Sequence, residues 1–372
     1  MRRNFKDIHL KSMMITVIYA NRNRDLKRIK ASLDTLKRQS AQNFEVVFVD
    51  YGSEEPLVHN LKQLCNSYEF VTPYVLPVSQ LLWNKSKALN YGISKSKSPY
   101  IFIADVDHIF HPDALLKMTE YSNPDSFTLF KMGYLDKDES KLLNESFKFT
   151  DLKVARSGEV NGMVLASTEA FKKINGFDEF FHFYGSEDID LFARLKHAGY
   201  KENYVKEKFI YHNWHSSFAN AEDDKLTVKP RMKNIMRINQ QHHKFNLENL
   251  VIKPIQQGEM GYLIEEKDSN KLLKPTKQFA IPNILAEVEH FLNFELPNLS
   301  NEIVHVVFFE DPYYSSLKHK AKKILGKQSQ PYCSLKEIND KILMQIVYNY
   351  RHSNYSYIVG KDLLSINFGL GI

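Results

Sequence analysis

Strand-like and helix-like segments alternate through the first third of the chain. Short runs rich in Ile, Val and Phe are each followed by a segment with Leu or Ile at helical spacing. This alternation is typical of a parallel sheet wound with helices, because parallel strands need a crossover connection. The sequence therefore predicts an α/β fold with a Rossmann-like, mostly parallel sheet. The expected strands are 13–20, 44–49, 70–78 and 100–104, and the expected helices are 26–39, 54–66 and 83–93.

Two carboxylates follow the last of these strands directly. Asp105 and Asp107 are two residues apart, so on an extended chain both would point to the same side. Ligands gather at the carboxyl ends of strands in such sheets. Adjacent carboxylates repel unless a cation joins them, and hard divalent ions that accompany phosphates prefer oxygen ligands. A bare Asp-x-Asp is more often a solvated turn, so the metal interpretation depends on the rest of the chain.

Polar residues at the other strand ends fit a phosphate-bearing ligand. Arg22 and Arg24 follow the first strand, and arginine can fork onto phosphate or a ring carbonyl. Asp50 ends the second strand before Gly-Ser, where a carboxylate often receives a ribose hydroxyl or a base N–H, although a simple turn explains it nearly as well. Lys87 and Asn90 share one helix face. The sequence contains no glycine-rich phosphate loop, so metal and basic side chains would have to hold phosphate.

A second acidic group follows Gly185. Ser186 is expected to cap a helix, and carboxylates in a first turn suit the helix dipole. Capping explains one or two of Glu187, Asp188 and Asp190, but it does not require all three.

His212 and His215 are the remaining candidate metal ligands. Two histidines three residues apart can converge on one ion from a helix turn or tight loop. Such a pair is more often structural or solvated.

The rest of the chain divides by composition. Residues 1–12 are expected to be a basic tail, 13–220 the main domain, 221–260 a helical linker or cover, and 261–372 a small α/β appendage of unassigned role. In the appendage we expect helices near 282–293 and 335–350, a strand at 303–309 and a final strand at 356–360.

The charge distribution and the cysteine content help to predict the cellular compartment of the protein. Residues 1–40 hold 11 Lys or Arg against 3 Asp, although the whole chain has a net charge of +6. This end could meet anionic lipid or phosphorylated substrates, with a solvated helix face as the simpler explanation; no nucleic-acid partner is expected. Two cysteines, no apolar run of membrane-spanning length and no signal-peptide core predict a cytoplasmic protein, with peripheral contact at the inner face of the membrane.

Five segments, in this order, resemble glycosyltransferases of the GT-A fold, particularly the beta-1,4-galactosyltransferase type and related bacterial polysaccharide transferases. The resemblance covers residues 13 to about 220. The segments are Arg22–Arg24, Asn84–Gly92, Asp105-Val106-Asp107, Asn175–Asp190 and the His212/His215 pair.

The chain departs from the family pattern at three places. The family's aromatic-Gly-aromatic-Gly run is here Phe183-Tyr184-Gly185-Ser186. Ile189 stands where an acid is often found, and His212 stands where Met is usual.

The resemblance implies an inverting, metal-dependent transfer of a hexose or N-acetylhexosamine of the Gal, GalNAc or GlcNAc type. The donor would be a UDP-sugar, and the acceptor a hydroxyl of a glycan or lipid-linked glycan in surface polysaccharide synthesis. Asp188 is implied as the base and Glu187 as a positioning group. The implied donor-binding residues are Arg22, Arg24, Asp50, Lys87, Asp105, Val106 and Asp107; the acceptor- or sugar-binding residues are Tyr184, Gly185 and Asp190; the ligands of Mn²⁺, or alternatively Mg²⁺, are Asp107, His212 and His215.

Two other functions remain open at this point. A metal-dependent nucleotidyltransferase also pairs carboxylates on a wound sheet, but it normally has a glycine-rich phosphate loop, which this sequence lacks. A non-catalytic nucleotide-sugar binding module would not need the acids and histidines to be intact. Release of pyrophosphate from nucleoside triphosphates would identify the former, and the absence of any product the latter.

Overall fold

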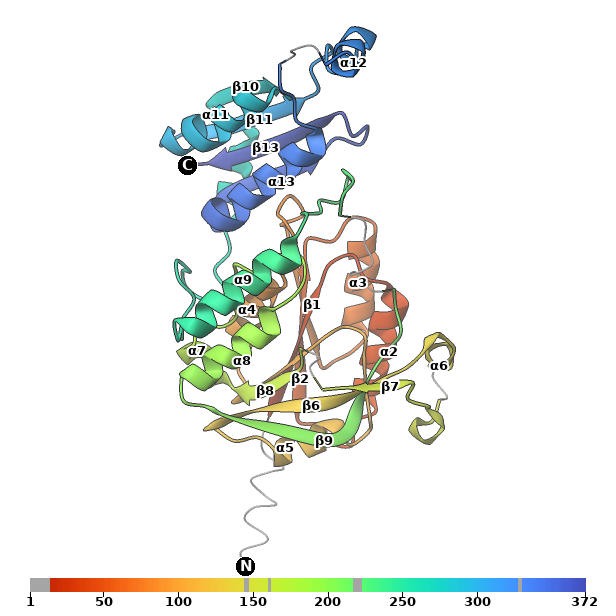
Figure 1. Ribbon diagram of the computed structural model, residues 1–372. Coiled ribbons are helices and arrows are strands. Elements are labelled where there is room, and N and C mark those ends of the chain that lie inside the picture. Colours follow the sequence, from red (N-terminus) through yellow and green to blue (C-terminus); the bar gives the residue numbers. More distant parts are fainter. Residues whose placement is uncertain (1–13, 144–146, 160–161, 217–222, 327–329) are drawn as a thin grey trace, which may run out of the picture. The chain divides into compact units, whose positions relative to one another are not determined.

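The computed structural model describes residues 14–372 except 144–146, 160–161, 217–222 and 327–329. The expected basic tail of residues 1–12 lies outside this part. The chain forms two compact units (Figure 1). The first contains residues up to 79, 83–220 and 238–262; the second contains 80–82, 221–237 and 263–372.

A large mixed sheet forms the centre of the first unit. In the described residues its strand order is β3-β2-β1-β4-β8-β6-β9-β5, with β7 paired to β6. Strands β1 to β4 are mutually parallel, whereas β8 pairs antiparallel with β4 and β6, and β5 with β9. The predicted wound, mostly parallel α/β fold is confirmed. The strands are β1 (Ile15–Asn21), β2 (Phe44–Tyr51), β3 (Val71–Leu76), β4 (Tyr100–Ala104), β5 (His108–Phe110), β6 (Ser126–Tyr134), β7 (Arg156–Gly158), β8 (Val164–Ser167) and β9 (Lys201–His212).

Helices follow the parallel strands as the periodicity predicts. Helix α2 buries Ile29, Leu33 and Leu36, and the Asp25 side chain caps it by accepting from the Lys27 N–H at 2.8 Å. Helix α4 approaches the sheet closely at Gly92, where a Cβ would stand 2.6 Å from Ile18 Cγ2. The helices of this unit are α2 (Leu26–Lys37), α3 (Leu57–Asn66), α4 (Lys85–Lys95), α5 (Ala114–Glu120), α6 (Lys137–Lys141), α7 (Thr168–Lys173), α8 (Glu187–His197) and α9 (Ile235–Glu248), with a short 3₁₀ turn at Phe149–Asp151.

Strand β9 is the main element that the sequence pattern did not predict. Five of its twelve residues are Lys or Glu, and only Val205, Phe209 and Ile210 are buried. A strand with so few buried positions lacks the period-2 signal on which prediction depends. Its pairing with β5 and β6 is what carries His212 into the site.

The second unit has its own smaller sheet, with strand order β10-β11-β13-β12 in the described residues. The strand predicted at 303–309 is confirmed as β11, but the strand predicted to be the last is followed by β13. Glycines and polar residues interrupt the apolar pattern of β13, although Ile366, Phe368 and Leu370 are buried. The elements are α10 (Glu266–Ser269), a 3₁₀ turn (Asn270–Leu273), β10 (Lys277–Pro282), α11 (Leu285–His290) continued by a π turn (Phe291–Glu295) and a 3₁₀ turn (Leu296–Asn298), β11 (Ile303–Phe309), α12 (Leu317–Ile324), α13 (Leu335–Gln345) continued by a π turn (Ile346–Tyr350), β12 (Asn354–Val359) and β13 (Ser365–Gly371).

Within the described residues, no helix has both the length and the apolar character needed to cross a bilayer.

Candidate functional site

The Asp105–Asp107 segment is a turn rather than the end of a strand. Strand β4 stops at Ala104, and the His108 N–H donates to the Asp105 carbonyl at 3.0 Å. The alternation expected for an extended chain therefore does not apply, and the two carboxylates have different partners. Asp107 turns toward His212 at the end of β9 and His215 just after it, whereas Asp105 turns toward the first residue of α4.

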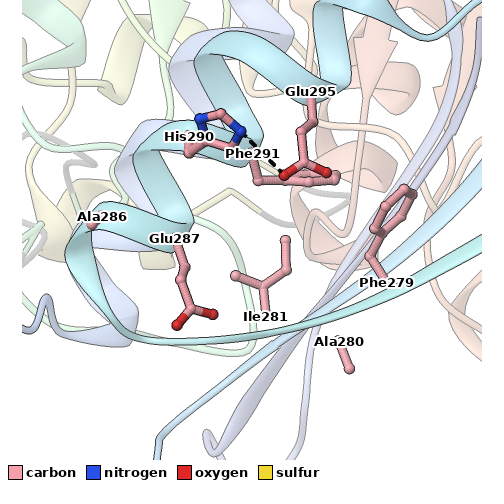
Figure 2. A pocket seen from close by; sticks show the side chains of 8 residues that line it. All are labelled: Phe279, Ala280, Ile281, Ala286, Glu287, His290, Phe291 and Glu295. Carbon is pink, nitrogen blue, oxygen red and sulfur yellow. Dashed lines mark ion pairs between the residues drawn. The ribbon is translucent and has the colours of Figure 1, made fainter.

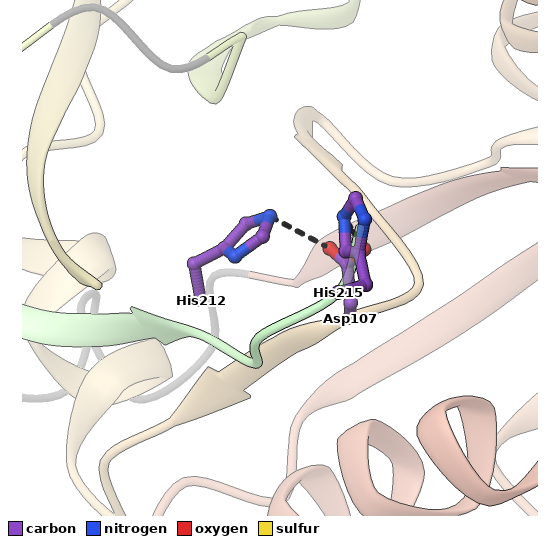
Figure 3. A group of neighbouring side chains, drawn as sticks. All are labelled: Asp107, His212 and His215. Atoms are coloured by element: carbon purple, nitrogen blue, oxygen red, sulfur yellow. Dashed lines mark ion pairs between the residues drawn. The ribbon is translucent and has the colours of Figure 1, made fainter. Parts of the chain in front are cut away.

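Asp107, His212 and His215 come together from segments about 100 residues apart (Figure 3). Asp107 Oδ2 lies 3.0 Å from His215 Nε2, and Oδ1 lies 3.7 Å from His212 Nε2. One ligand atom from each residue falls within 4.8 Å of the other two. Because β9 ends at His212, the chain leaves the sheet at this point and returns His215 to the same carboxylate.

The electrostatics of this group suit a bound cation. Burial alone would raise the pKa of the Asp107 carboxyl, but the hydrogen bond with His215 and the nearby His212 outweigh it and hold the pKa well below its usual range. Asp107 Oδ1 is buried without a hydrogen-bond partner among the described residues. One carboxylate and two imidazoles are a suitable donor set for a first-row divalent ion, and the unused Oδ1 gives such an ion a ready ligand.

Two basic residues reach the carboxylates, and the sequence interpretation missed both. Lys85 Nζ lies 2.8 Å from Asp105 Oδ1 and 3.5 Å from Glu187 Oε1. Arg28, on α2, places Nη1 3.9 Å from Asp107 Oδ2, and this atom is buried without a hydrogen bond among the described residues. Periodicity could have found Arg28, which lies four residues before the buried Ser32 and so on the same side of α2. Lys85 is the first residue of α4, directly after the N-cap Asn84, and no sequence pattern marks its contact with Asp105.

The predicted Lys87 lies elsewhere. It is almost fully buried, and its Nζ is 3.9 Å from Glu179 Oε2. Asn90 donates to Glu179 Oε1 at 3.0 Å, so the two residues do share one helix face, as predicted. That face packs against residues 177–179 and not against Asp105 or Asp107.

Glu187 and Asp188 open helix α8. Ser186 occupies the cap position but adopts a left-handed φ of 72° and makes no side-chain cap bond, so the predicted capping by its hydroxyl is wrong. Burial raises the pKa of Glu187. The negative charge of Asp188 raises this pKa further, and the positive charge of Lys85 opposes both effects. Asp188 Oδ2 lies 3.7 Å from the point where a Cβ would stand on Gly162.

Asp190 belongs to a buried network under α9. Its carboxylate accepts from Arg194 Nε at 2.7 Å and from Asn246 Nδ2 at 2.9 Å. Asn246 also donates to Asp178 Oδ2 at 3.1 Å, and His242 Nε2 lies 2.8 Å from the same oxygen. Of the residues expected to touch acceptor or sugar, Asp190 is thus fully buried, whereas Tyr184 is 44% exposed.

Replacing Asn246 with alanine is expected to destabilise the first unit. Two buried carboxylates each lose a donor, which costs roughly 2–3 kcal/mol and lowers the melting temperature by about 4–10 °C. Thermal unfolding followed by circular dichroism would measure the shift. Asn249→Ala, an exposed asparagine just beyond the same helix, is the matched control and should melt within about 1–2 °C of wild type. Equal melting of the two variants would contradict a stabilising role for the network.

The predicted nucleotide-side residues lie on the β1 and β2 ends. Asp50 is fully buried and accepts from Asn21 Nδ2 at 2.6 Å and from the Ser53 N–H and hydroxyl at 3.0 and 2.6 Å. Arg22 donates to the Ser79 carbonyl at 2.7 Å, and Arg24 is exposed. Val106 is buried between the two aspartates. Asp50, Arg22 and Arg24 thus lie at or just beyond the ends of β1 and β2, whereas Val106 lies in the turn that carries Asp107.

A cavity of about 330 Å³ lies in the second unit between β10 and α11 (Figure 2). Phe279, Ile281 and Phe291 give it an apolar wall, and a 3.5 Å ion pair joins His290 to Glu295 at its side. None of its lining residues belongs to the group of carboxylates and imidazoles above.

Two models of glycosyltransferase families match segments of the first unit. Residues 16–172 match the model of Glycosyl transferase family 2, and residues 143–216 match that of the N-terminal domain of galactosyltransferase. Together these segments span residues 16–216, and they contain Asp50, Asp105, Asp107, Glu187, Asp188, His212 and His215.

Individual relatives agree with this assignment. An uncharacterized glycosyltransferase of Haemophilus influenzae is 22% identical over 226 residues, which are 57% of this chain and 72% of that protein. One of Methanocaldococcus jannaschii is 22% identical over 238 residues, 59% of this chain and 80% of that protein.

Two solved structures resemble part of the chain. TarS of S. aureus has a TM-score of 0.41 and 16% identity, covering 54% of this chain and 37% of TarS. A mannosyltransferase of Pyrobaculum calidifontis, in complex with GDP-Man and Mn²⁺, has a TM-score of 0.41 and 17% identity, covering 66% of this chain and 65% of its own. The family matches and the wound sheet lead to one conclusion: the chain is a glycosyltransferase of the GT-A fold.

Proposed function

We propose that the enzyme transfers a sugar from a nucleotide-sugar donor to an acceptor hydroxyl, with inversion at the anomeric carbon and with the help of a divalent ion. The observation that supports this most directly is the convergence of Asp107, His212 and His215 beside Asp105 and Lys85. The matched family models favour glycosyl transfer over the nucleotidyltransferase and the non-catalytic module.

The metal fits the residues present. Asp107, His212 and His215 would hold it, and Mn²⁺ is the expected ion, with Mg²⁺ as the alternative, because imidazole nitrogen binds first-row ions more firmly. A bound ion supplies positive charge for the diphosphate that leaves with the nucleotide. Arg28 lies against the same carboxylate and adds a fixed positive charge on the α2 side of the site.

The proposed acid–base residue lies in the first turn of α8. The acceptor hydroxyl must lose a proton as it attacks, and Asp188 is the proposed base. Glu187 is held by Lys85 and is the proposed positioning group for acceptor or donor sugar. Burial raises the pKa of Glu187, and the positive charge of Lys85 opposes this rise.

The donor and acceptor belong to the same proposal. UDP carrying a hexose or N-acetylhexosamine of the Gal, GalNAc or GlcNAc type is the proposed donor. Asp50 and Arg22 are the proposed contacts to the base and ribose, and Arg24 is a further proposed donor contact. Lys87 packs against Glu179 and is not among them. Tyr184, Gly185 and Asp190 are the proposed acceptor-side residues. Asp190 would act indirectly, because its hydrogen bonds with Arg194 and Asn246 hold the start of α8 in place. A glycan or lipid-linked glycan of a surface polysaccharide is the proposed acceptor, used at the inner face of the membrane.

A screen of nucleotide sugars tests this function. The protein is incubated with UDP- and GDP-sugars, with and without Mn²⁺, and melting temperature and nucleoside diphosphate release are measured. We expect one UDP-sugar to stabilise the protein in the presence of Mn²⁺ and to be hydrolysed slowly. Pyrophosphate release from nucleoside triphosphates, or no response to any nucleotide sugar, would overturn the proposal.

Lys85→Met is expected to lower kcat/KM about 10- to 100-fold, because it removes a positive charge fixed between Asp105 and Glu187. Lys85 lowers the pKa of Glu187, so without it that pKa rises further and the acid limb of the pH–rate profile should move to higher pH. Lys62→Met, an exposed lysine on α3, is the control. An unchanged profile for Lys85→Met would show that Lys85 does not act on Glu187.

A further inference from the structure

Helix α12 (Leu317–Ile324) presents its apolar side to solvent. Leu317, Ile324 and the following Leu325 are 84%, 85% and 67% exposed, and Ala321 between them is exposed too. These residues are spaced i, i+4, i+7 and i+8, which places them on one stripe of a helix. In a globular protein such a stripe normally packs against the core. Here nothing in the described residues covers it.

The opposite side of the helix anchors it to the second unit. His319 is only 7% exposed, and its Nδ1 lies 2.9 Å from the Tyr314 carbonyl oxygen. Its ring centre is 5.5, 5.7 and 5.1 Å from those of Tyr313, Tyr314 and Tyr332. The helix cannot turn its apolar stripe inward without giving up this packing. The outward orientation is therefore part of the structure.

Lysines border the stripe on both sides. At 100° per residue, Lys318 and Lys320 fall on opposite flanks of the line through Leu317 and Ile324. Within the described part of the chain no carboxylate pairs with either lysine. The sequence from 312 to 336 contains no Asp or Glu, and its lysines are Lys318, Lys320, Lys322, Lys323, Lys327 and Lys336.

We infer that α12 is a docking surface for an anionic lipid membrane. An exposed apolar stripe flanked by lysines is the pattern of a helix that lies in a bilayer interface, with its apolar side among the acyl chains and its cations at anionic headgroups. Charge complementarity favours this occupant over a second copy of the chain, because two such helices would bring lysines against lysines. The inference does not depend on which donor or acceptor the transferase uses.

Vesicle co-sedimentation of the full chain tests the surface. We compare vesicles of phosphatidylcholine alone with vesicles that also contain phosphatidylglycerol, at low and high salt. Wild type should prefer the anionic vesicles and should release at high salt, which screens the lysines. Leu317→Ser/Ile324→Ser changes no charge, so residues 1–40 contribute equally to both proteins, and it should lower the partition coefficient about tenfold or more. Lys318→Gln/Lys320→Gln should lower it by a similar factor on anionic vesicles only.

Leu273→Ser is the matched control, since Leu273 is 78% exposed in the same unit but lies outside α12. It should bind vesicles as wild type does. Donor hydrolysis and circular dichroism spectra should be unchanged in all these variants, which separates a failure of docking from a failure of the proposed function.

Three results would overturn the inference. One is equal binding of wild type to both kinds of vesicle, or no binding to either. Another is a loss for Leu273→Ser as large as for Leu317→Ser/Ile324→Ser. The third is a wild-type dimer in sedimentation velocity that the serine variant dissociates, because the stripe would then be an interface between copies.

Discussion

Asp188→Asn is expected to retain donor binding and to lower sugar transfer by a factor of about 10² to 10⁴, the usual contribution of a general base. Asparagine keeps the shape of the side chain but cannot accept the acceptor's proton. The residue lies in the first turn of α8, next to Glu187, and its carboxylate borders the loop at Gly162. Its Oδ1 accepts from the N–H of Ile189 at 2.8 Å, and its Oδ2 faces Gly162.

Donor affinity and turnover are measured separately in this experiment. Thermal shift or calorimetry with the donor and Mn²⁺ gives binding, and product formation gives the rate. Asp125→Asn, an exposed aspartate before β6, is the control for the chemical change itself. Transfer at a near wild-type rate by Asp188→Asn would exclude Asp188 as the base, and Glu187→Gln would then be tested.

Loss of the metal ligands should have an effect of similar size. His212→Ala and His215→Ala should each raise the Mn²⁺ concentration needed for half-maximal activity about 10- to 100-fold or more, and Asp107→Ala should abolish the metal-dependent rate. Asp107 lies within 3.7 Å of both imidazoles, so removing it takes away the carboxylate ligand that the two histidines share. His59→Ala, an exposed histidine on α3, is the control.

Metal binding should also weaken at acid pH. The hydrogen bond with Asp107 raises the pKa of His215 above its ordinary value, so in the metal-free protein this ring is protonated at a higher pH than a free histidine. Only the neutral ring can bind the ion, so affinity for Mn²⁺ should fall as pH drops through the raised pKa of His215. Titration calorimetry across pH measures this. Full activity in excess chelator, or in the double His variant without added metal, would contradict the assignment.

Short-range patterns in the sequence were enough to predict the first half of the large sheet. The strands before Asp105 are buried and apolar and the helices between them are amphipathic, so each segment carries its own periodicity. The Asp-x-Asp and His-x-x-His spacings could likewise be read directly. The reason is that these features depend on neighbours a few residues apart.

Only the tertiary structure decided which of these residues meet. Strand β9 has few buried positions, yet its pairing beside β5 and β6 is what delivers His212 and His215 to Asp107. The same is true of the two adjacent helical lysines: Lys85 reaches Asp105 because it opens α4 at the strand ends, whereas Lys87 turns into the packing against Glu179.

The polar helix α9 was expected to be a linker or cover, and nothing in its local pattern indicates which residues it contacts. In the structure Asn246 bridges Asp178 and Asp190, which lie 68 and 56 residues away in sequence. Hydrogen bonds between distant segments depend on how the chain folds back on itself, and periodicity along the sequence does not record that. The sequence determined the sheet and the chemistry available to it, and the three-dimensional packing determined the site.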